Sequence, residues 1–512
     1  MRTHLWFLSF SLVIFTFSSL RDGLSATYYV KNGGHDTATG LSDAEAWQTI
    51  QKVNEFAFSD GDVLCLKRGS VFSDTFLNSP QVDHFTFRAY GTGPLPHIDG
   101  SKTASIRIKQ SHTIQNLIIR DIDISGMDWK KDKASNAVIE RVHNLALHSL
   151  VFDGHRNSVS SEGKTAITIE NCSGNITIKN CQLSNFGPIG LPVMGRDFMG
   201  LALIGIESGS YEIRDNTIHD GNADCIHLYH CSATGSVFNN ILFNAGENCI
   251  DIKGSSNVHV YDNELYRTPD FLALGGSGSA GGLIVAHATG EQACSKLEIN
   301  GNVFKTSNTP GLITGNAKNI DVYDNTFDEM MGAIRIGNHT EGIHIHHNLF
   351  LNPKSLMHDN GMDVGCIYVN NSRSGTQIYN NTVYNERGDC LALLAIGYSN
   401  RNKVFRNIFY QSKPNGLCLV YTGHGLDPVI YENCWFSGAN EKLIKYRGKV
   451  YTQAEENEWN TIASNDRFAD PLFVDPANKN FETKDATPCK TGGAVWGNTG
   501  SALSPPKNMT IH

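Results

Sequence analysis

Short stretches in which every second residue is apolar recur along the chain from about residue 165 to residue 436. Two of them, "CIHLYH" (225–230) and "CIDIKG" (249–254), align without a gap. A period of two places successive side chains on opposite faces, so the pattern predicts β-strands and not helices. In each unit a second strand follows, and it ends in a turn that contains an Asn. These turn residues are Asn216, Asn240, Asn263, Asn302, Asn325, Asn348, Asn381, Asn407 and Asn433.

The units repeat at intervals of about 20–30 residues, which predicts a β-solenoid with two or three short strands per turn. In a solenoid, equivalent residues of successive rungs stack. An Asn at the same turn of each rung is then expected to hydrogen-bond its neighbours, which satisfies its buried amide. A β-propeller is the alternative, but its blades need roughly 40–50 residues.

The strand pattern, the "xxNxF" ladder and the Gly- and Asn-rich turns resemble the right-handed parallel β-helix proteins of the pectate lyase-like superfamily. The segment "YYVKNGGHDTATGLSDAEAWQTIQKVNEFAFSDGDVLCLKRGSVF" resembles the N-terminal opening of such proteins. The segment "FADPLFVDPANKNFETKDATPCKTGG" resembles their C-terminal closing segment. The resemblance implies an all-β fold: a right-handed parallel β-helix with an N-terminal cap and an irregular C-terminal tail. This architecture carries many unrelated activities.

The expected organisation has four parts. Residues 1–26 read as a secretory signal peptide, with a basic start, an apolar run over Leu5–Phe17 and a small-residue end near Ala26. Residues 27–100 form the cap and first rungs, where "DAEAWQTIQKVNEFA" suits a short amphipathic helix over the solenoid end. Residues 101–440 form the β-helix, and residues 441–512 form a tail packed on the last rungs. Insertions between rungs are expected to wall a groove.

Composition and charge narrow the classes of function. The signal peptide, with no other apolar run of about 18 residues, predicts an exported protein, extracellular or periplasmic, without a membrane span. A net charge of −9 argues against nucleic acid as a partner, and an acidic polymer would need a local basic patch. Most of the 12 Cys fall in strand-like segments, where either core packing or disulfides suit them; none has zinc-site spacing. We expect a monomer.

Outward-facing positions of the first strand of each rung collect polar residues on one face. The third-position column is read as His227, Asp251, Val285, Thr314, Arg335 and Tyr368. The fifth-position column is read as Tyr229, Lys253, His287, Asn316, Gly337 and Asn370. Just before these strands stand Asp224, Glu247 and Asn248. This concentration predicts a functional groove, with an ordinary solvated face as the alternative. Within it, His227, Tyr229, Asn316 and Tyr368 are the predicted substrate-binding residues.

One chemistry that fits is β-elimination from a uronic acid polymer, in which a base removes the C5 proton and cations neutralise the carboxylate. "GENCIDIKGSSN" resembles a stretch of the alginate lyase and chondroitinase B family, which implies Lys253 as the base. Arg335 and His287 then assist with the carboxylate. Calcium is the candidate cofactor, with Asp224, Glu247, Asn248 and Asp251 on adjacent rungs as ligands. "ENCID" is similar to the calcium cluster of one pectate lyase family, with Asn248 in place of its second acid.

The second chemistry is hydrolysis. "NADCIHL", "GENCIDI", "AHA" and "RIG" resemble, in order, the "NTDG", "DD", "GHG" and "RIK" strings of polygalacturonases. The resemblance implies Asp224 and Glu247 as the two carboxylates, His287 as a helper and Arg335 as a carboxylate clamp. Asn248 and Gly337 depart from those strings.

These patterns predict a secreted enzyme that degrades an acidic polysaccharide, with a lyase favoured over a polygalacturonase-like hydrolase. The third hypothesis is a non-catalytic carbohydrate-binding β-helix. The His344, His346 and His347 cluster lies on a different strand and is interpreted as structural or solvated, not as a set of metal ligands.

Overall fold

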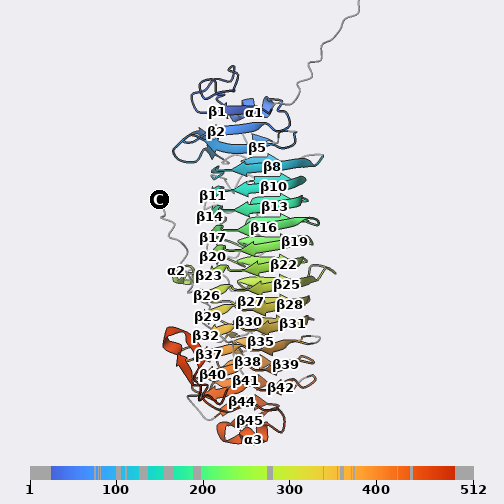
Figure 1. Cartoon of the computed structure of the whole chain (residues 1–512), viewed down its shortest axis with the longest axis vertical. Coiled ribbons are helices and arrows are strands. Elements are labelled where there is room, and N and C mark those ends of the chain that lie inside the picture. The colour runs from blue at the N-terminus through green and yellow to red at the C-terminus, as the bar shows by residue number, and fades with distance from the viewer. Residues whose placement is uncertain are drawn as a thin grey trace, which may run out of the picture.

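The computed structural model describes residues 25–73, 77–78, 80, 82–99, 105–109, 112–125, 137–154, 165–187, 198–273, 281–337, 339–354, 356–357, 363–370, 372, 375–423, 425–438 and 442–489. The predicted signal peptide lies outside these residues except for its last two, as does the end of the predicted tail from residue 490. The described chain winds into a long solenoid whose rungs stack from the N-terminal end to the C-terminal end (Figure 1).

Each complete rung contributes one strand to each of three long sheets, which we call A, B and C. Sheet C holds the first strand of the rung, sheet A the second and sheet B the third.

Sheet C contains β4 (Leu77–Asn78), β7 (Ile106–Ile108), β9 (Ala137–Glu140), β12 (Thr165–Glu170), β15 (Met199–Ile204), β18 (Ile226–Tyr229), β21 (Ile250–Lys253), β24 (Ile284–His287), β27 (Leu312–Gly315), β30 (Ile334–Gly337), β35 (Ile367–Val369), β38 (Ala392–Ile396), β41 (Leu417–Tyr421), β44 (Lys442–Tyr446) and β45 (Lys449–Thr452).

Sheet A contains β1 (Thr27–Val30), β2 (Val63–Lys67), β5 (Thr86–Tyr90), β8 (Ile114–Arg120), β10 (Val142–His148), β13 (Ser173–Lys179), β16 (Ser210–Arg214), β19 (Thr234–Phe238), β22 (Ser256–Tyr261), β25 (Cys294–Asn300), β28 (Ala317–Tyr323), β31 (Glu341–His346), β36 (Gln377–Tyr379), β39 (Lys403–Phe405) and β42 (Val429–Tyr431).

Sheet B contains β11 (Val151–Asp153), β14 (Gln182–Ser184), β17 (Thr217–Gly221), β20 (Ile241–Ala245), β23 (Glu264–Tyr266), β26 (Val303–Ser307), β29 (Thr326–Met330), β32 (Leu349–Leu351), β37 (Thr382–Asn385), β40 (Ile408–Gln411) and β43 (Cys434–Ser437).

The remaining strands form pairs: β3 (Val71–Phe72) with β6 (His97–Ile98), β33 (Leu356–Met357) with β34 (Asp363–Val364), and β46 (Phe473–Asp475) with β47 (Asn480–Thr483). The described helices are short: α1 (Ile50–Glu55), α2 (Pro269–Ala273), α3 (Glu456–Trp459), and the 3₁₀ turns η1 (Gln453–Glu455) and η2 (Pro476–Asn478). Among the described residues, no helix has the length and apolar character needed to cross a bilayer.

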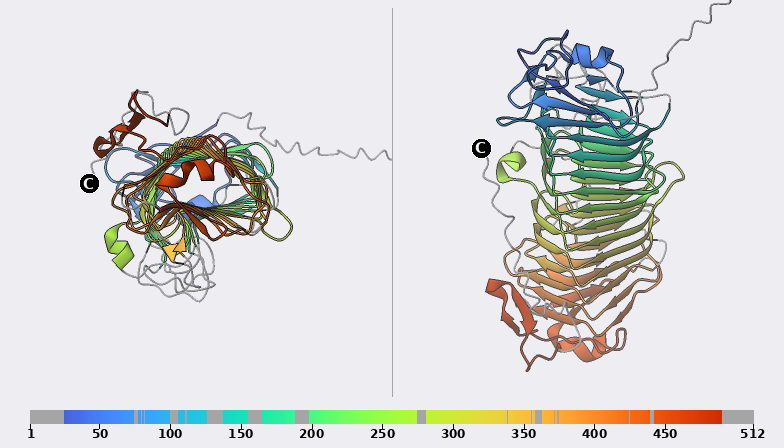
Figure 2. Two further views of the ribbon diagram at one scale, coloured as in Figure 1. Left: turned by 90° about the horizontal axis from the view of Figure 1, so that it is seen from below. Right: turned by 45° about the horizontal axis from the view of Figure 1, so that its top comes forward.

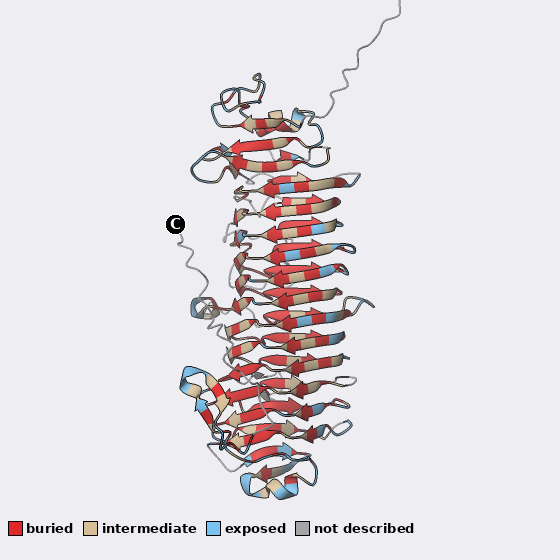
Figure 3. Cartoon of the chain, viewed as in Figure 1, coloured by how far each residue is buried: buried red, intermediate tan, exposed pale blue. Residues whose placement is uncertain are grey.

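The alternation in the sequence becomes the division between core and surface. On β18 and β21 the inward residues Ile226, Leu228, Ile250 and Ile252 are all fully buried, and they join one core cluster that runs through the solenoid. Burial shows the same alternation along most strands (Figure 3). Because parallel pairing stacks equivalent residues, each rung covers the apolar side chains of the previous one.

The predicted Asn ladder is present from Asn216 to Asn433. In a typical step, Asn302 donates its Nδ2 and backbone N–H to Oδ1 of Asn325, each at 3.0 Å. The ladder ends on the buried Asp466, whose Oδ1 accepts from Asn433. Oδ2 of Asp466 accepts from the indoles of Trp435 and Trp459 at 2.7 Å each. The buried amides are thereby satisfied along the whole stack.

The two ends of the solenoid are covered by short helices. Helix α1 lies at the N-terminal end, and α3 lies across the C-terminal end (Figures 1 and 2). Thr49 caps α1 by accepting from the N–H of Lys52, and Ile50 and Val53 are its buried residues. Such caps shield the apolar interior of the terminal rungs from water.

One disulfide, Cys434–Cys489, fastens the C-terminal segment to β43. The other described cysteines are reduced and buried: Cys65, Cys172, Cys181, Cys225, Cys231, Cys249, Cys294, Cys366, Cys390 and Cys418. Of the two roles open to the strand cysteines, the structure gives core packing to all but Cys434.

Candidate functional site

A groove of about 380 Å³ runs along the outer face of sheet C, over β18, β21, β24, β27, β30 and β35. Strand register sets its two columns of outward residues. One column is His227, Asp251, Val285, Ile313, Arg335 and Tyr368. The other passes through Lys253, His287, Gly315 and Gly337. Asp224, Glu247, Asn248 and Gly281, from the turns before the strands, line one side.

A buried ionic network occupies the N-terminal part of the groove. Nδ1 of His227 lies 3.0 Å from Oδ2 of Asp224 and 3.2 Å from Oδ2 of Asp251. The other oxygen of Asp251 lies 3.1 Å from Nε2 of His287. Asp224, His227 and Asp251 are 3%, 7% and 5% exposed. His227 therefore joins two carboxylates on successive rungs, and Asp251 joins two histidines.

The contacts within the network shift the pKa values of Asp224, His227 and Asp251 in different directions. Burial raises the pKa of Asp224 to about 6, although hydrogen bonds from His227 and Asn248 oppose it. Burial alone would lower the pKa of His227, but Asp224 and Asp251 outweigh it and raise this pKa to about 10. For Asp251, burial is outweighed by hydrogen bonds from His227 and His287, and the pKa falls to about 2. At neutral pH the centre of the network is a protonated His227 facing ionised Asp251.

Asn248 completes the shell around Asp224. Its Nδ2 donates to Oδ1 of Asp224 at 2.8 Å, while its Oδ1 accepts from the backbone N–H of Gly282 at 3.1 Å. Because a backbone N–H can only donate, the orientation of the Asn248 amide is fixed. Glu247 is half-buried at the groove wall, and its carbonyl accepts from the buried guanidinium of Arg267 at 2.8 Å.

The other part of the groove carries cationic and neutral polar groups. Lys253 follows Asp251 on β21 and is paired in register with His287 on β24. Arg335 on β30 is paired with Tyr368 on β35. Burial raises the pKa of Tyr368 against the opposing effect of Arg335, which keeps the phenol neutral as a hydrogen-bond donor.

Three of the four predicted calcium ligands, Asp224, Asn248 and Asp251, have their polar side-chain atoms engaged by other protein groups. Both oxygens of Asp224 and both of Asp251 already accept hydrogen bonds or ion pairs from protein groups. Asn248 turns its nitrogen, not its oxygen, toward Asp224. Calcium prefers several oxygen ligands, so this arrangement does not fit the ion. Calcium binding stays a prediction, and the mechanism below uses no metal.

The prediction of outward-facing residues from the sequence was wrong at one rung. On β27 the residues paired with Val285 and His287 are Ile313 and Gly315, whereas Thr314 and Asn316 were expected there. Leu312 and Thr314 face the core and are 0% and 2% exposed. The error arose because the inward residue is a polar Thr and the outward one an apolar Ile, and a one-residue slip exchanges the faces of a strand.

Two of the predicted substrate-binding residues lie outside the groove. Asn316 is exposed in the turn between β27 and β28, with a left-handed φ of 50°. Tyr229 sits at the adjoining rung end, where its ring stacks on His227 at 5.9 Å between centroids. The structure brings the other predicted residues together: Asp224, His227, Glu247, Asn248, Asp251, Lys253, His287, Arg335 and Tyr368. Gly281, Ile313 and Gly315 also line the groove but were not predicted from the sequence. Ile313 and Gly315 can be placed there only when the register of β27 is known.

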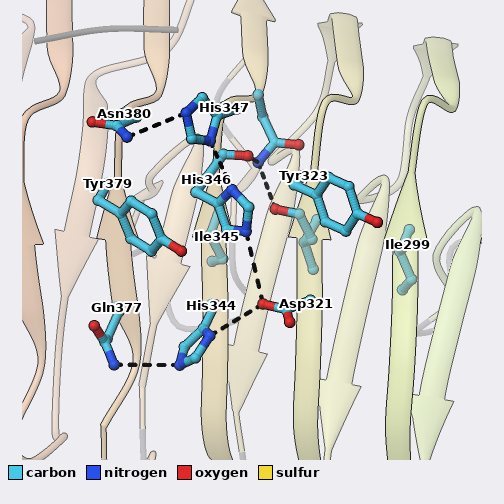
Figure 4. A network of polar contacts seen from close by, with 12 residues as sticks. Ile299, Asp321, Tyr323, His344, Ile345, His346, His347, Gln377, Tyr379 and Asn380 are labelled. Carbon is cyan, nitrogen blue, oxygen red and sulfur yellow. Dashed lines mark hydrogen bonds and ion pairs between the residues drawn. The ribbon is translucent and has the colours of Figure 1, made fainter.

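The second histidine cluster lies on sheet A (Figure 4). Nδ1 of His344 lies 3.1 Å from Oδ1 of Asp321, and Nδ1 of His346 lies 2.8 Å from Nδ1 of His347. The His346 ring stacks between Tyr323 and Tyr379 at centroid distances of 5.2 and 4.7 Å. With both ring faces covered, His346 belongs to an aromatic ladder along the sheet, in agreement with the structural interpretation.

Comparison with known proteins supports the fold. The sequence model of the right-handed β-helix region matches residues 97–265. The chain folds as a right-handed parallel β-helix. The predicted fold class, and the resemblance to the pectate lyase-like superfamily at the level of the fold, are thereby confirmed. No curated protein matches the chain in sequence.

Several solved structures are similar to this chain at low identity. The A-module of the Azotobacter vinelandii mannuronan C-5 epimerase AlgE6 is 14% identical, with 80% of this chain and 91% of that chain covered and a TM-score of 0.41. A PL6 family polysaccharide lyase from Pseudopedobacter saltans is 12% identical, with coverages of 88% and 98% and a TM-score of 0.35. The GH136 lacto-N-biosidase from Eubacterium ramulus is 14% identical, with coverages of 87% and 67% and a TM-score of 0.33.

Proposed function

We propose that this β-helix protein is an exported lyase that cleaves a uronic-acid-containing polysaccharide by β-elimination. The observation that carries the proposal is that the groove has two chemically different parts, one with buried carboxylates and one with cationic and phenolic side chains. The carboxylates of Asp224 and Asp251 are already bound by His227, His287 and Asn248. The wall beyond them presents Lys253, Arg335 and Tyr368, which suit an anionic sugar.

The proposed base is His287. Its Nε2 faces Asp251 at 3.1 Å, which directs the proton to that nitrogen and leaves Nδ1 as the acceptor. This contact favours His287 over Lys253, the base that the sequence resemblance implied. Lys253 is adjacent in register, so its ammonium is placed to neutralise the carboxylate of the sugar whose proton His287 removes. Arg335 lies three strands away, where it suits the carboxylate of a neighbouring sugar.

In the proposed β-elimination, the C5–H bond and the bond from C4 to the glycosidic oxygen break. His287 takes the proton from C5 of the uronate, and the electron pair of the C5–H bond becomes the C4=C5 double bond. The bond from C4 to the glycosidic oxygen breaks, and that oxygen is protonated by water. Negative charge that builds up on the carboxylate during proton removal is stabilised by Lys253, which lies beside His287. The proton on His287 then returns to solvent.

A glycoside hydrolase is the second candidate, and the raised pKa of Asp224 favours it because general acids need such a shift. Two observations weigh against it. Asp251, the acid next to Asp224 in the groove, does not complete an inverting pair, because one oxygen of each residue lies within 4.8 Å of the other, closer than the roughly 6.5–9.5 Å between the carboxyl groups of inverting enzymes. Asp224 is also only 3% exposed, and hydrogen bonds from His227 and Asn248 to its two oxygens compete with any contact to a substrate oxygen.

The test measures ultraviolet absorbance of the C4=C5 double bond while the mature protein is incubated with pectate, alginate or chondroitin. A lyase yields absorbing products. Reducing ends without absorbance would establish the hydrolase instead, and binding without either signal would establish a carbohydrate-binding protein.

Matched histidine variants test the assignment of the base. His287→Gln is expected to lower kcat by about 10²–10⁴-fold, the usual contribution of a general base. His344→Gln is the control, because His344 pairs with Asp321 at 3.1 Å, the distance between His287 and Asp251, and lies on sheet A outside the groove. Equal activity of the two variants would refute the role of His287.

A further inference from the structure

Two glycines interrupt the line of side chains along the groove. From β21 to β30 the second column reads Lys253, His287, Gly315 and Gly337, each paired in register with the next. Both glycines line the groove. The outer face of β27 and β30 therefore has no side chain in this column, between His287 on one side and Asn370 on the other. We call this stretch the floor of the groove.

Neither packing nor backbone conformation explains the glycines. A Cβ built on Gly315 meets no atom within 4 Å, and one on Gly337 meets only backbone oxygens, at 3.7 and 3.8 Å. Both residues also lie outside the positive-φ region that favours glycine. Glycine within a strand costs about 0.5–1 kcal/mol relative to Ala. Glycine in a strand often marks a bulge, a tight bend, or the close approach of a ligand or another backbone. The register through Gly315 and Gly337 is regular, so no bulge accounts for them, and close approach of a ligand is the explanation that remains on this open face.

The surroundings of the bare floor indicate the ligand. Val285 and Ile313 flank it in the neighbouring column and offer an apolar surface to the C–H face of a sugar ring. Arg335 and Tyr368 stand at one end, and His287 and Lys253 stand at the other. We propose that Gly315 and Gly337 form the floor of a subsite that seats one uronate ring flat on β27 and β30, with its carboxylate toward Arg335. The identity of the sugar as a uronate rests on the proposed function.

A graded series of side chains on the floor tests the subsite. Gly315→Ala, Gly315→Val and Gly337→Val are expected to fold with unchanged or raised Tm, because the added atoms meet open space and suit a strand. Gly315→Val is expected to raise KM at least tenfold, with a smaller change in kcat, and Gly315→Ala to have an intermediate effect. Lys445→Val is the control, because it places the same side chain at an exposed outward position of β44, in sheet C but outside the groove.

Binding is measured separately from cleavage, so the subsite and the lyase activity can fail independently. Calorimetry with tetragalacturonate and tetraguluronate is carried out in the His287→Gln background, with and without Gly315→Val. At least tenfold weaker binding of either oligosaccharide in the Gly315→Val protein supports the subsite, even if the parent protein makes no unsaturated product. Unchanged Kd and KM in a protein that does make the product would overturn the subsite and leave the lyase standing. Failure to bind either oligosaccharide would also overturn the subsite.

Discussion

Replacement of Asn325 by Ala would remove the middle of the Asn ladder. The Asn325 side chain is fully buried and takes part in five hydrogen bonds. Its Nδ2 donates to the carbonyls of Ile299 and Tyr323 and to Oδ1 of Asn348, at 2.8–3.0 Å. Its Oδ1 accepts from the backbone N–H and the Nδ2 of Asn302.

The groups left behind determine the cost. In Asn325→Ala, the Nδ2 of Asn302 keeps the carbonyls of Val260 and Asn300, and Oδ1 of Asn348 keeps the backbone N–H of residue 325. The backbone N–H of Asn302 loses its acceptor inside the solenoid. An unpaired buried donor costs about 1–3 kcal/mol, and each other lost hydrogen bond about 1 kcal/mol. Four other side-chain hydrogen bonds are lost, so the expected loss of unfolding free energy is about 5–7 kcal/mol.

Hydrogen exchange measures this loss where it occurs. In the wild type the backbone amide of Asn302 should be among the slowest to exchange, and in the variant its protection should fall sharply together with that of adjacent rungs. Urea unfolding gives the global loss. Asn175→Ala is the control, since Asn175 is exposed and its side chain contacts the Ser210 hydroxyl at 3.1 Å. A change below about 1 kcal/mol in Asn325→Ala, comparable to the control, would refute the ladder as a source of stability.

Three further outcomes are expected. Burial, and then His347, lower the pKa of His346 to about 4, so the neutral side chain stabilises the fold above about pH 6.5 and this contribution is lost as the pH falls toward 4. In urea unfolding, the unfolding free energy of His346→Phe should therefore rise relative to that of the wild type by up to roughly 3 kcal/mol between about pH 6.5 and 4. Equal pH profiles of the two proteins would contradict this. Cys489→Ser should make the C-terminal segment the first site of limited proteolysis and cost about 2–4 kcal/mol, whereas unchanged cleavage would show that packing alone holds it. A chelator should leave lyase activity unchanged, because the oxygens of Asp224 and Asp251 are bound by protein groups; recovery of lost activity with calcium would contradict this.

Much of the candidate site follows from the repeat. Once the rungs are aligned, a period of two assigns Ile226 and Ile250 to the core and places His227, Asp251 and Lys253 on one outer face. Stacking then brings Asp251 near His287 and Arg335 near Tyr368 although each pair is more than 30 residues apart in sequence. The alignment fails where composition contradicts orientation, as at Thr314, which faces inward beside an outward Ile313.

The sequence by itself determined the strands, the solenoid and the Asn ladder, because these depend on a local period that is repeated many times. Only the tertiary structure decided what the polar residues do for one another. The bond of His227 to two carboxylates, the amide of Asn248 held by Gly282, and the bare floor at Gly315 each depend on strand register and on side chains from separate rungs. Such contacts have no period, so no pattern along the chain could reveal them.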